Sequence, residues 1–363
     1  MKDPRVAFIG AGWVVRTIWA PLLAQQEAQI VSIIDPQPRS PEAFDDLPVA
    51  PRHHGCISEK ALEGCNLAFI CSPNARHVSQ AIRAMRKGLH VILEKPACLS
   101  ASDADALIEH SRQAGVEVLV TAAASHRSDV GAMLEAVARG DVGTLHCIDV
   151  SWRRRNGVPR PGSWFTRADQ ALAGSGADLG WHLLEVALQI LGYPLVDAAL
   201  CNHVPAAADE ASREATWRAD EDGNSSGAID VESQSYSCLQ TRGGALIRLS
   251  TAWASHQQRD ETLITLYGSA GQLRLHTTFG FSQNRVTQPS LVLSVAGTDT
   301  PLDFAAEENL APYRAFLARR IAQIGECAAS RELEYRKLQS LASAMSAMYP
   351  HLSNPGDALH RQA

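Results

Sequence analysis

A carboxylate and an imidazole stand four residues apart in the segment 174–185, just after a glycine-containing turn. If this segment is helical, the side chains of Asp178 and His182 point the same way. A histidine beside a carboxylate is suited to moving a proton on and off a hydroxyl, because the ordinary pKa of imidazole is about 6.5. The spacing therefore predicts an acid–base pair, and the simpler interpretation is a capping or solvated pair.

The N-terminal end of the chain contains an apolar run that stops at two glycines, Gly10 and Gly12. A strand, a tight turn and a helix N-terminus form a cradle for a diphosphate. Asp35 follows a second apolar run about twenty residues later, where an acidic residue accepts the ribose hydroxyls of NAD. Gly10 would permit the turn and Gly12 the approach of the pyrophosphate. Without Asp35, an ordinary strand–helix turn would explain the glycines equally well.

Length and charge limit the classes of protein to consider. The chain has 363 residues, of which 45% are hydrophobic, and this suggests two domains of about 150 residues each with full cores. Its net charge of −6 offers no basic surface for nucleic acid. No apolar stretch approaches the ~20 residues that span a bilayer, and no signal-peptide pattern is present. We expect a cytoplasmic protein that binds neither nucleic acid nor a membrane.

The cysteines and histidines do not form a metal-binding pattern. Eight cysteines are scattered without a C-x-x-C pair, so neither a zinc cluster nor a dense disulfide framework is indicated. The pair His53 and His54 and the other histidines fit hydrogen-bonded surface or core positions better than ligand positions. We predict no metal site.

Strand and helix patterns alternate through the first third of the chain, and this predicts a doubly wound parallel sheet in a domain spanning residues 1–122. The predicted strands lie near residues 5–10, 30–35, 66–71, 90–93 and 117–121, and the predicted helices near 12–27, 58–64, 75–87 and 100–114.

Polar residues follow two of these strands at their carboxyl ends. Ser72-Pro73-Asn74 comes after one strand and Glu94-Lys95-Pro96 after the next. Ligands bind at this edge of such sheets. The position of Lys95 favours a functional role over a simple ion pair with Glu94.

From about residue 144 the pattern changes to polar–apolar alternation, which predicts an antiparallel sheet with one solvated or partner-facing side. These runs lie at 145–152, 232–240, 245–253, 262–267 and 272–275. We assign residues 123–363 to this second domain, with closing helices at 310–330 and 338–349. The acidic segment 205–230 is expected to be a solvated loop, although its charge could also attract a cationic substrate.

Several motifs in order resemble the glucose-fructose oxidoreductase, inositol dehydrogenase and rhizopine-catabolism (Gfo/Idh/MocA) family over nearly the whole chain. They are Glu94-Lys95-Pro96, Ser163-Trp164-Phe165-Thr166, the pair Gly174 and Gly176, Asp178-x-Gly180-x-His182, and Leu191-Gly192-Tyr193-Pro194. The resemblance implies a Rossmann domain, an α/β domain with a large open sheet that often forms oligomers, a nicotinamide cofactor, and a catalytic set that maps onto Lys95, Asp178 and His182.

The chain departs from the family pattern at four places. Val15 replaces the third glycine of the dinucleotide fingerprint, Ser175 replaces the middle glycine of a G-G-G run, and Glu185 stands where aspartate is usual. Residues 122–124 are Ala-Ala-Ala where many members have Asn or Gln and then Arg. This should leave a roomier, less polar edge to the pocket, and it affects the substrate more than the chemistry.

We expect the cofactor to be NAD rather than NADP, because Asp35 should repel a 2′-phosphate; Arg39 could instead accept one. The residues expected at the cofactor are Gly10, Gly12, Trp13, Val14, Asp35, Arg39, Ser72, Pro73, Asn74, His77, Glu94, Lys95 and Trp164. Those expected at the substrate are Lys95, Arg153, Arg155, Asp178 and His182, because three consecutive arginines cannot all face one pocket.

Hydride transfer from a secondary alcohol needs a base for the hydroxyl proton and a cation for the developing alkoxide. We assign the first role to His182 and the second to Lys95, and we expect Asp178 to orient His182 or to hold a neighbouring hydroxyl. The family resemblance implies a sugar, glycoside, cyclitol or aminocyclitol as substrate. We expect a homodimer or homotetramer, because the alternating strands of the second domain leave an open sheet face that needs covering. The alternatives are an enzyme that retains its NAD while cleaving or eliminating a glycoside, and a sugar-sensing regulator without catalysis.

Overall fold

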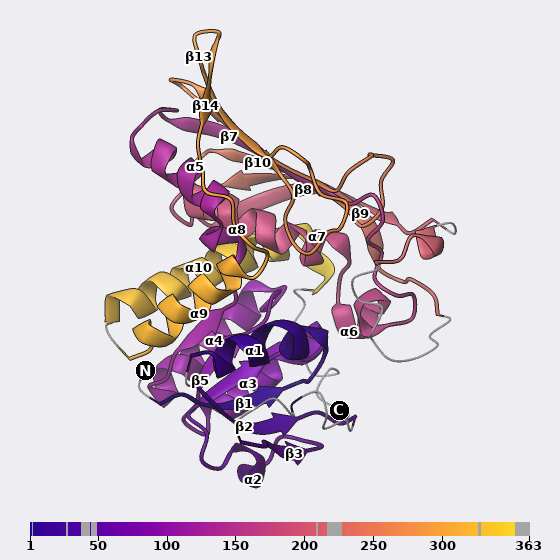
Figure 1. Cartoon of the computed structure of the whole chain (residues 1–363), viewed down its shortest axis with the longest axis vertical. Helices are drawn as coiled ribbons and strands as arrows, with labels where there is room; N and C mark the ends of the chain where they lie inside the picture. Colours follow the sequence, from indigo (N-terminus) through magenta and orange to yellow (C-terminus); the bar gives the residue numbers. More distant parts are fainter. Residues whose placement is uncertain are drawn as a thin grey trace.

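The computed structural model describes residues 1, 3–26, 28–37, 44, 49–207, 210–215, 227–325 and 328–352. Two sheets lie at opposite ends of the molecule, and helices α8, α9 and α10 lie between them (Figure 1). Arg39, residues 208–209 and 216–226 of the acidic segment 205–230, and the last residues of the chain fall outside the described residues.

The first sheet has six strands in the order β3-β2-β1-β4-β5-β6, and every pair is parallel. The strands are β1 (Arg5–Ile9), β2 (Gln29–Ile34), β3 (Arg52–His54), β4 (Leu67–Ile70), β5 (His90–Leu93) and β6 (Val118–Val120). The residues of β4 are all buried, as expected for a strand covered by helices on both faces. The predicted doubly wound parallel sheet is therefore confirmed.

Helices follow the strands as in a Rossmann domain. They are η1 (Val15–Trp19, π-helical), α1 (Ala20–Ala24), α2 (Glu59–Leu62), η3 (Asn74–Arg76), α3 (His77–Met85) and α4 (Ala101–Ala114). Helix α4 begins where the Ser100 hydroxyl accepts a hydrogen bond from the Asp103 amide, and it ends at Gly115 with φ of 67°. These are the usual start and stop signals of a helix.

The second sheet has eight strands in the order β14-β13-β12-β11-β7-β10-β9-β8, and only β7 and β10 pair in parallel. The strands are β7 (Leu145–Arg153), β8 (Val196–Pro205), β9 (Glu232–Thr241), β10 (Leu246–Ala252), β11 (Glu261–Gly268), β12 (Gln272–Thr277), β13 (Ser290–Val295) and β14 (Thr298–Leu302). A large, mostly antiparallel sheet was predicted and is confirmed.

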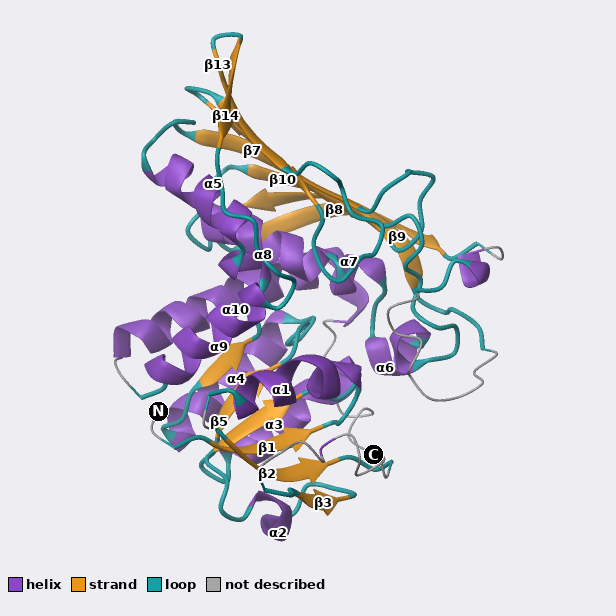
Figure 2. Cartoon of the chain, viewed as in Figure 1, coloured by secondary structure: helices purple, strands orange, loops and turns teal. Residues whose placement is uncertain are grey.

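Helices pack on the face of this sheet that looks toward the Rossmann domain (Figure 2). They are η4 (Ala124–His126), α5 (Ser128–Ala138), α7 (Ser175–Asp178), α8 (Gly180–Ile190) and part of α10 (Ala328–Met348), while η5 (Trp164–Thr166) and α6 (Ala168–Ala171) lie at the side of the domain. In the part of the chain that the structure describes, no helix covers the opposite face.

The C-terminal helices join the two halves of the molecule. Phe316 and Leu317 of α9 (Ala311–Gln323) are buried in the core of the Rossmann domain. Helix α10 contacts both α4 and β8. The break between these helices comes at Ile324 and Gly325, earlier than predicted, because Gly325 has φ of 85°, which a helix cannot continue through.

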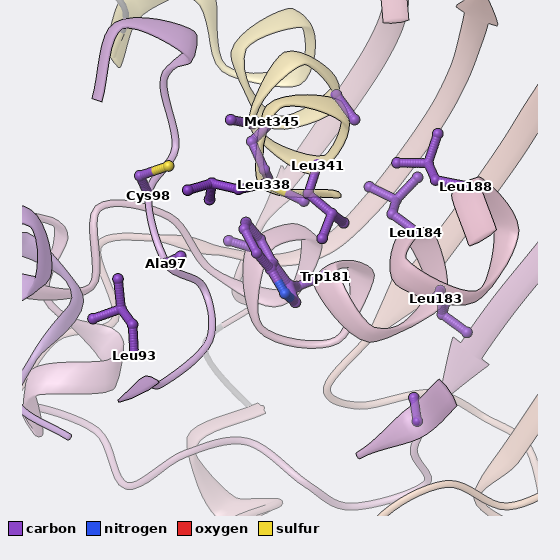
Figure 3. Packing of buried hydrophobic residues seen from close by; sticks show 14 of the residues in the cluster. Leu93, Ala97, Cys98, Trp181, Leu183, Leu184, Leu188, Leu338, Leu341 and Met345 are labelled. Atoms are coloured by element: carbon purple, nitrogen blue, oxygen red, sulfur yellow. The ribbon is translucent and has the colours of Figure 1, made fainter. Parts of the chain in front are cut away.

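Trp181 of α8 is the centre of the core between the two sheets. Its indole ring lies against Leu338 and Leu341 of α10 (Figure 3). Leu93 and Ala97, which flank the Glu94–Pro96 loop, belong to the same buried cluster. Helix α8 therefore packs on the C-terminal helix and shares one buried core with the residues that flank the loop after β5.

Part of the acidic segment packs on the protein instead of extending into solvent as expected. The turn η6 (Glu210–Ser212) is followed by Arg213, whose guanidinium donates to carbonyl oxygens of Arg155 and Ser255. Glu214 pairs with Arg160 at 3.1 Å. The charges of Arg213 and Glu214 therefore attach this part of the segment to the protein, and this is why the expectation of a solvated loop was wrong for it.

The described residues were searched for membrane-spanning helices, for metal-binding groups and for disulfides. The searched helices include none that is both long and apolar enough to cross a membrane. The described histidine, cysteine, aspartate and glutamate side chains form no group that could hold a metal ion. The seven described cysteines are free thiols.

Candidate active site

The turn after β1 is built to receive a diphosphate. Gly10 has φ of 93°, and a Cβ atom there would lie 2.7 Å from backbone atoms of Cys71 and Ser72, so only glycine fits. A Cβ on Gly12 would meet no atom within 4 Å, because the space above the turn is open. Val15, at the third glycine position, is fully buried in the apolar interior under this turn. These features fit a dinucleotide cradle despite the incomplete fingerprint.

Asp35 lies directly beside this turn. One carboxylate oxygen accepts a hydrogen bond from the amide of Ala11 at 2.8 Å, and the other accepts from the amide of Gln37 at 2.9 Å. The carboxylate is thus held at the end of β2, where an adenosine ribose lies in a Rossmann domain.

The loops after β4 and β5 bring polar groups to the same edge of the sheet. Asn74 is buried, and its amide donates to the carbonyl of Ala171 at 2.8 Å, which ties this loop to the second domain. His77 is also buried, with its ring nitrogens 2.8 Å from the carbonyl oxygens of Ser72 and Pro96. Burial lowers the pKa of His77 to about 4. His77 lies between the two loops, and in its neutral form the ring has one N–H and donates to only one of these two carbonyl oxygens.

Glu94 does not pair with the ammonium of Lys95. Its carboxylate accepts from the indole of Trp19 at 2.7 Å and from the backbone amide of Lys95 at 3.0 Å. Burial raises the pKa of this carboxyl group, and the Lys95 charge opposes that shift. The Lys95 side chain is therefore left to reach across to the second domain.

Lys95 pairs with Asp178 across the interface between the domains. The ammonium donates to Oδ1 of Asp178 at 2.6 Å and to its backbone carbonyl at 3.2 Å, and both side chains are largely buried. The other carboxylate oxygen accepts from the indole of Trp253 at 2.9 Å. Asp178 thus holds Lys95 in place, whereas orientation of His182 was one of the roles we expected for it.

The turn before Asp178 is held by a second carboxylate, Glu232. Its two oxygens accept from the amides of Gly174 at 2.8 Å and Gly176 at 3.0 Å. The hydroxyl of Tyr349 also donates to Glu232, at 2.7 Å. Both glycines lie too close to neighbouring groups to carry a side chain. This explains the glycine-containing turn that precedes the predicted acid–base pair.

His182 lies in the first turn of α8, with its ring 5.9 Å from that of Trp152. Burial is the main cause that lowers its pKa to about 3; the positive charges of Lys95 and Arg154 lower it further, and Asp178 opposes them. The imidazole is therefore neutral at physiological pH and has a free lone pair to accept a proton.

An open cavity of about 1010 Å³ lies between the two domains and contains these groups. Among the predicted site residues, the cavity is lined by Gly12, Trp13, Val14, Ser72, Asn74, His77, Glu94, Lys95, Trp164, Asp178 and His182. Gly10, Asp35 and Pro73 stand behind this lining, in the turns that shape it, and Arg39 falls outside the described residues.

The arginines of β7 are arranged differently from our prediction. Arg153 points to the open face of the sheet, where it donates to the Ser250 hydroxyl at 2.7 Å, and Arg155 is exposed. Arg154 lines the cavity instead and lies over the ring of Trp152 at 4.9 Å. The reason is the alternation of side chains along a strand, which places Arg154 on the same side as Trp152.

Several aromatic residues of the cavity were not predicted. Trp152, Phe165, Phe281 and Tyr313 line it, and the ring of Phe281 meets that of Trp13 edge-on at 5.5 Å. Trp152 could have been found from the phase of the apolar residues in β7. Phe281 comes from a distant loop and Tyr313 from the first turn of α9, and neither position carries a local signal for the site.

Two of the three alanines at 122–124 lie at the edge of the cavity, and Ala122 faces away from it. Ala123 and Ala124 line a side lobe behind His182, together with Arg127, whose guanidinium pairs with Asp129 at 2.6 Å. Small side chains here leave room beyond the imidazole for part of a substrate.

Comparison with known proteins gives two family matches. The family model described as "Oxidoreductase family, NAD-binding Rossmann fold" matches residues 4–122. The model of the "GFO/IDH/MocA C-terminal domain" matches residues 130–274.

Individual relatives share the same architecture. A protein of Amycolatopsis mediterranei named "Putative UDP-kanosamine synthase oxidoreductase subunit" is 35% identical over 84% of this chain and 83% of its own length. The crystal structure of KijD10, a 3-ketoreductase from Actinomadura kijaniata in complex with NADP and TDP-benzene, has a TM-score of 0.72 at 19% identity, covering 96% of this chain and 98% of that one. GenD2 from gentamicin A biosynthesis, in complex with NAD, has a TM-score of 0.70 at 18% identity, covering 96% and 94%.

Proposed function

Because the chain belongs to the Gfo/Idh/MocA family of oxidoreductases, we propose that it transfers hydride between a nicotinamide dinucleotide and a secondary alcohol or ketone of a sugar. The observation that carries this proposal is the cavity between the domains, which brings Lys95 and His182 to the open turn at Gly12. The cofactor supplies the hydride acceptor or donor when it is bound.

In this proposal, residues of the chain transfer the proton, stabilise the charge on the substrate oxygen and position these groups. The neutral imidazole of His182 takes the hydroxyl proton during oxidation and returns it during reduction. The ammonium of Lys95 donates a hydrogen bond to the same oxygen as negative charge develops on it. Asp178 and Trp253 position Lys95, because one carboxylate bonds to both.

The preferred substrate in this proposal is a hexose that carries a nucleoside diphosphate. Arg154 supplies a cation to the cavity wall, and the aromatic pair Trp164 and Phe165, with ring centroids 3.8 Å apart, offers a surface for a base or a sugar ring. The name of the Amycolatopsis mediterranei relative points to a UDP-sugar.

A substrate panel tests this function. Steady reduction of NAD or NADP should occur with a nucleoside diphosphate hexose, and kcat/KM should be higher than for the free sugar or methyl glycoside. Arg154→Met should reduce kcat/KM for the nucleotide sugar about 10–100-fold, since a hydrogen bond to a charged group contributes about 1.5–3 kcal/mol. Arg155→Met, one residue along and exposed, is the matched control. Equal loss for charged and uncharged substrates would contradict the anion-binding role.

The same assay distinguishes this function from two alternatives. An enzyme that retains its NAD would consume a glycoside without net formation of NADH. A sensor would bind the dinucleotide and the sugar without turnover, and the Lys95–Asp178 pair beside a neutral His182 argues against it because a sensor needs no proton acceptor.

We further propose that NAD is preferred over NADP, because the Asp35 carboxylate stands at the turn where the ribose hydroxyls would bind. Titration of protein fluorescence with NADH and NADPH should give the lower dissociation constant for NADH. Asp35→Ala should weaken NADH binding about 10–100-fold, through loss of hydrogen bonds to a charged group, and should leave NADPH binding nearly unchanged. Tighter binding of NADPH to the unmodified protein would reject this preference.

We also propose that the open face of the second sheet joins copies of the chain into a dimer or tetramer. Leu200 on β8 is 80% exposed, and Tyr236 and Leu246 on the neighbouring strands are also exposed. An apolar sheet face of this kind is costly in water unless it is covered. Light scattering at micromolar concentration should show an oligomer, and Leu200→Arg should shift it toward monomer. Leu333→Arg, on α10 and 41% exposed, should have no such effect. A monomer in the unmodified protein would refute the proposal.

A further inference from the structure

A second cavity lies behind the active site, on the other side of α8, and we call it the rear cavity. It is open to solvent on one side and has a volume of about 900 Å³, including the space at its mouth, between α8, α9, α10 and the segment after β6. Its lining includes the cations Arg319, Arg320 and Lys337, the carboxyl groups of Glu185 and Glu334, and the indole of Trp181. Nothing in the proposed reaction uses these groups.

Several buried polar atoms in the wall of the rear cavity have no hydrogen-bond partner. They belong to five residues, and the atoms are His126 Nε2, Trp181 Nε1, Glu185 Oε2, Gln189 Oε1 and Arg320 Nε. Trp181, Glu185 and Arg320 are each more than nine-tenths buried. Buried polar atoms of this kind destabilise the fold unless something supplies the missing hydrogen bonds. Their concentration in one cavity points to a bound polar molecule.

The charges around the cavity favour an anion. Arg320 and Lys337 both donate to the same oxygen of Glu334, at 2.7 and 2.8 Å, so one carboxylate is shared between two cations. Arg319 adds a third positive charge at the rim. Glu185 is the remaining carboxyl group in the lining.

Glu185 does not cancel the excess of positive charge in the rear cavity at neutral pH. Burial raises its pKa to about 7, although a hydrogen bond from the Ser125 hydroxyl opposes the shift. A carboxyl group with this pKa is protonated in part of the molecules at pH 7. The cavity therefore holds at least one uncompensated positive charge.

The unpartnered atoms also include acceptors, and these restrict the ligand further. Oε1 of Gln189 needs a donor, and so does Oε2 of Glu185, one turn earlier in α8, in the molecules in which this carboxyl group is ionised. The indole of Trp181 and the guanidinium of Arg320 need an acceptor. A ligand that satisfies both kinds of atom must accept hydrogen bonds through an oxyanion and donate one through a hydroxyl.

We propose that the rear cavity binds a small oxyanion that also carries a hydroxyl group, of the kind represented by monohydrogen phosphate and by short hydroxycarboxylates. The oxyanion would accept from Trp181, Arg320 and Lys337. The hydroxyl would donate to Glu185 or Gln189. Binding would tie α8 to α9 and α10 without entering the active-site cavity.

Calorimetric titration of the full chain, with and without NADH, tests this proposal with defined probes. Phosphate and L-malate should bind with dissociation constants in the millimolar range or below and should raise the melting temperature. Sulfate and succinate are the matched probes without the hydroxyl, and they should bind about tenfold more weakly, as expected for one lost hydrogen bond of about 1.4 kcal/mol. Phosphate binding without malate binding would identify inorganic phosphate as the source, and the reverse would identify a carboxylate.

Variants locate the site. Trp181→Phe removes the indole N–H and keeps the aromatic packing, and Lys337→Met removes a charge; each should weaken phosphate and malate binding about tenfold. Arg336→Met, exposed on the same helix, and Arg154→Met, in the active-site cavity, should leave this binding unchanged. The proposal is overturned if neither probe binds at tens of millimolar, if sulfate and succinate bind equally well, or if Arg154→Met abolishes binding. Since the readout is binding, failure of the proposed reaction would not affect it.

Discussion

Replacing His182 with alanine should lower turnover by about 10²–10⁴-fold, the range typical of a general acid–base group. In the proposed mechanism the neutral imidazole accepts the proton, and Lys95 does not replace it because its ammonium is paired with Asp178. Steady-state rates with the best substrate of the panel would measure the loss. Binding of NADH, followed by fluorescence, should be retained.

Gln189→Ala is a useful control, because Gln189 lies on the same helix as His182 but faces the rear cavity. It should keep turnover within a few-fold of the unmodified rate. Near-normal turnover in His182→Ala would assign the base to another group. Tyr236 cannot be that group, because it is exposed on the open sheet face and donates to Gln234 at 2.9 Å.

The dependence of the oxidation rate on pH should reflect the ionisation of His182. Since the pKa of His182 is lowered to about 3, the group is neutral above this value, and the rate should be flat near neutrality and fall as the imidazole becomes protonated in acid. Lys95 lowers this pKa and Asp178 raises it. Lys95→Met should therefore move the acid limb to higher pH, and Asp178→Asn should move it to lower pH. A limb that stays in place in both variants would assign the ionisation elsewhere.

The Rossmann domain was predictable because its signals are local. The strands β1, β2, β4 and β5 are apolar runs with turn residues after them, and their order follows from the connections. β3 was missed because its residues, Arg52–His54, are polar and only partly buried at the sheet edge. β14 was missed for a similar reason: it contains a proline and is almost fully exposed, and it forms only because β13 offers an edge for pairing.

The site was partly predictable, and the missing part depends on long-range contacts. The position of the loops after β4 and β5 at the cavity could be predicted, because the carboxyl ends of parallel strands lie at the same edge of the sheet. The choice between Arg153 and Arg154 followed from the phase of β7, in which Ile148, Val150 and Trp152 are buried. That phase was visible in the sequence, and applying it would have selected Arg154.

The hydrogen-bond partners of Asp178 could not be predicted from the spacing of residues near it in the sequence. Four residues separate it from His182, and this spacing suggested that the two interact directly. Its carboxylate bonds instead to Lys95 and Trp253, which are 83 and 75 residues away in the chain. The turn is set by a similarly remote group, because Glu232 and Tyr349 hold the glycines before Asp178.

Replacing Gly174 with alanine should disrupt this arrangement more than any other small substitution near the site. A Cβ at this position would lie 1.9 Å from the carbonyl oxygen of Glu232, which is backbone and cannot rotate away. The turn and β9 would have to separate, and the hydrogen bond from the Gly174 amide to Glu232 would lengthen. We expect a loss of about 3 kcal/mol in the free energy of unfolding, the upper part of the range for overpacking.

The turnover of Gly174→Ala should fall together with its free energy of unfolding. The displaced turn leads directly into α7, and Asp178 is the last residue of that helix. The free energy would be measured by denaturant unfolding, and kcat at a temperature where the variant remains folded. Gly131→Ala is the matched control: a Cβ there meets nothing within 4 Å, and the residue lies inside α5. Alanine should stabilise that helix by about 0.5–1 kcal/mol. If Gly174→Ala unfolds and turns over like the control, Glu232 does not fix the position of Asp178, and the Lys95–Asp178 pair must be set by the domain interface alone.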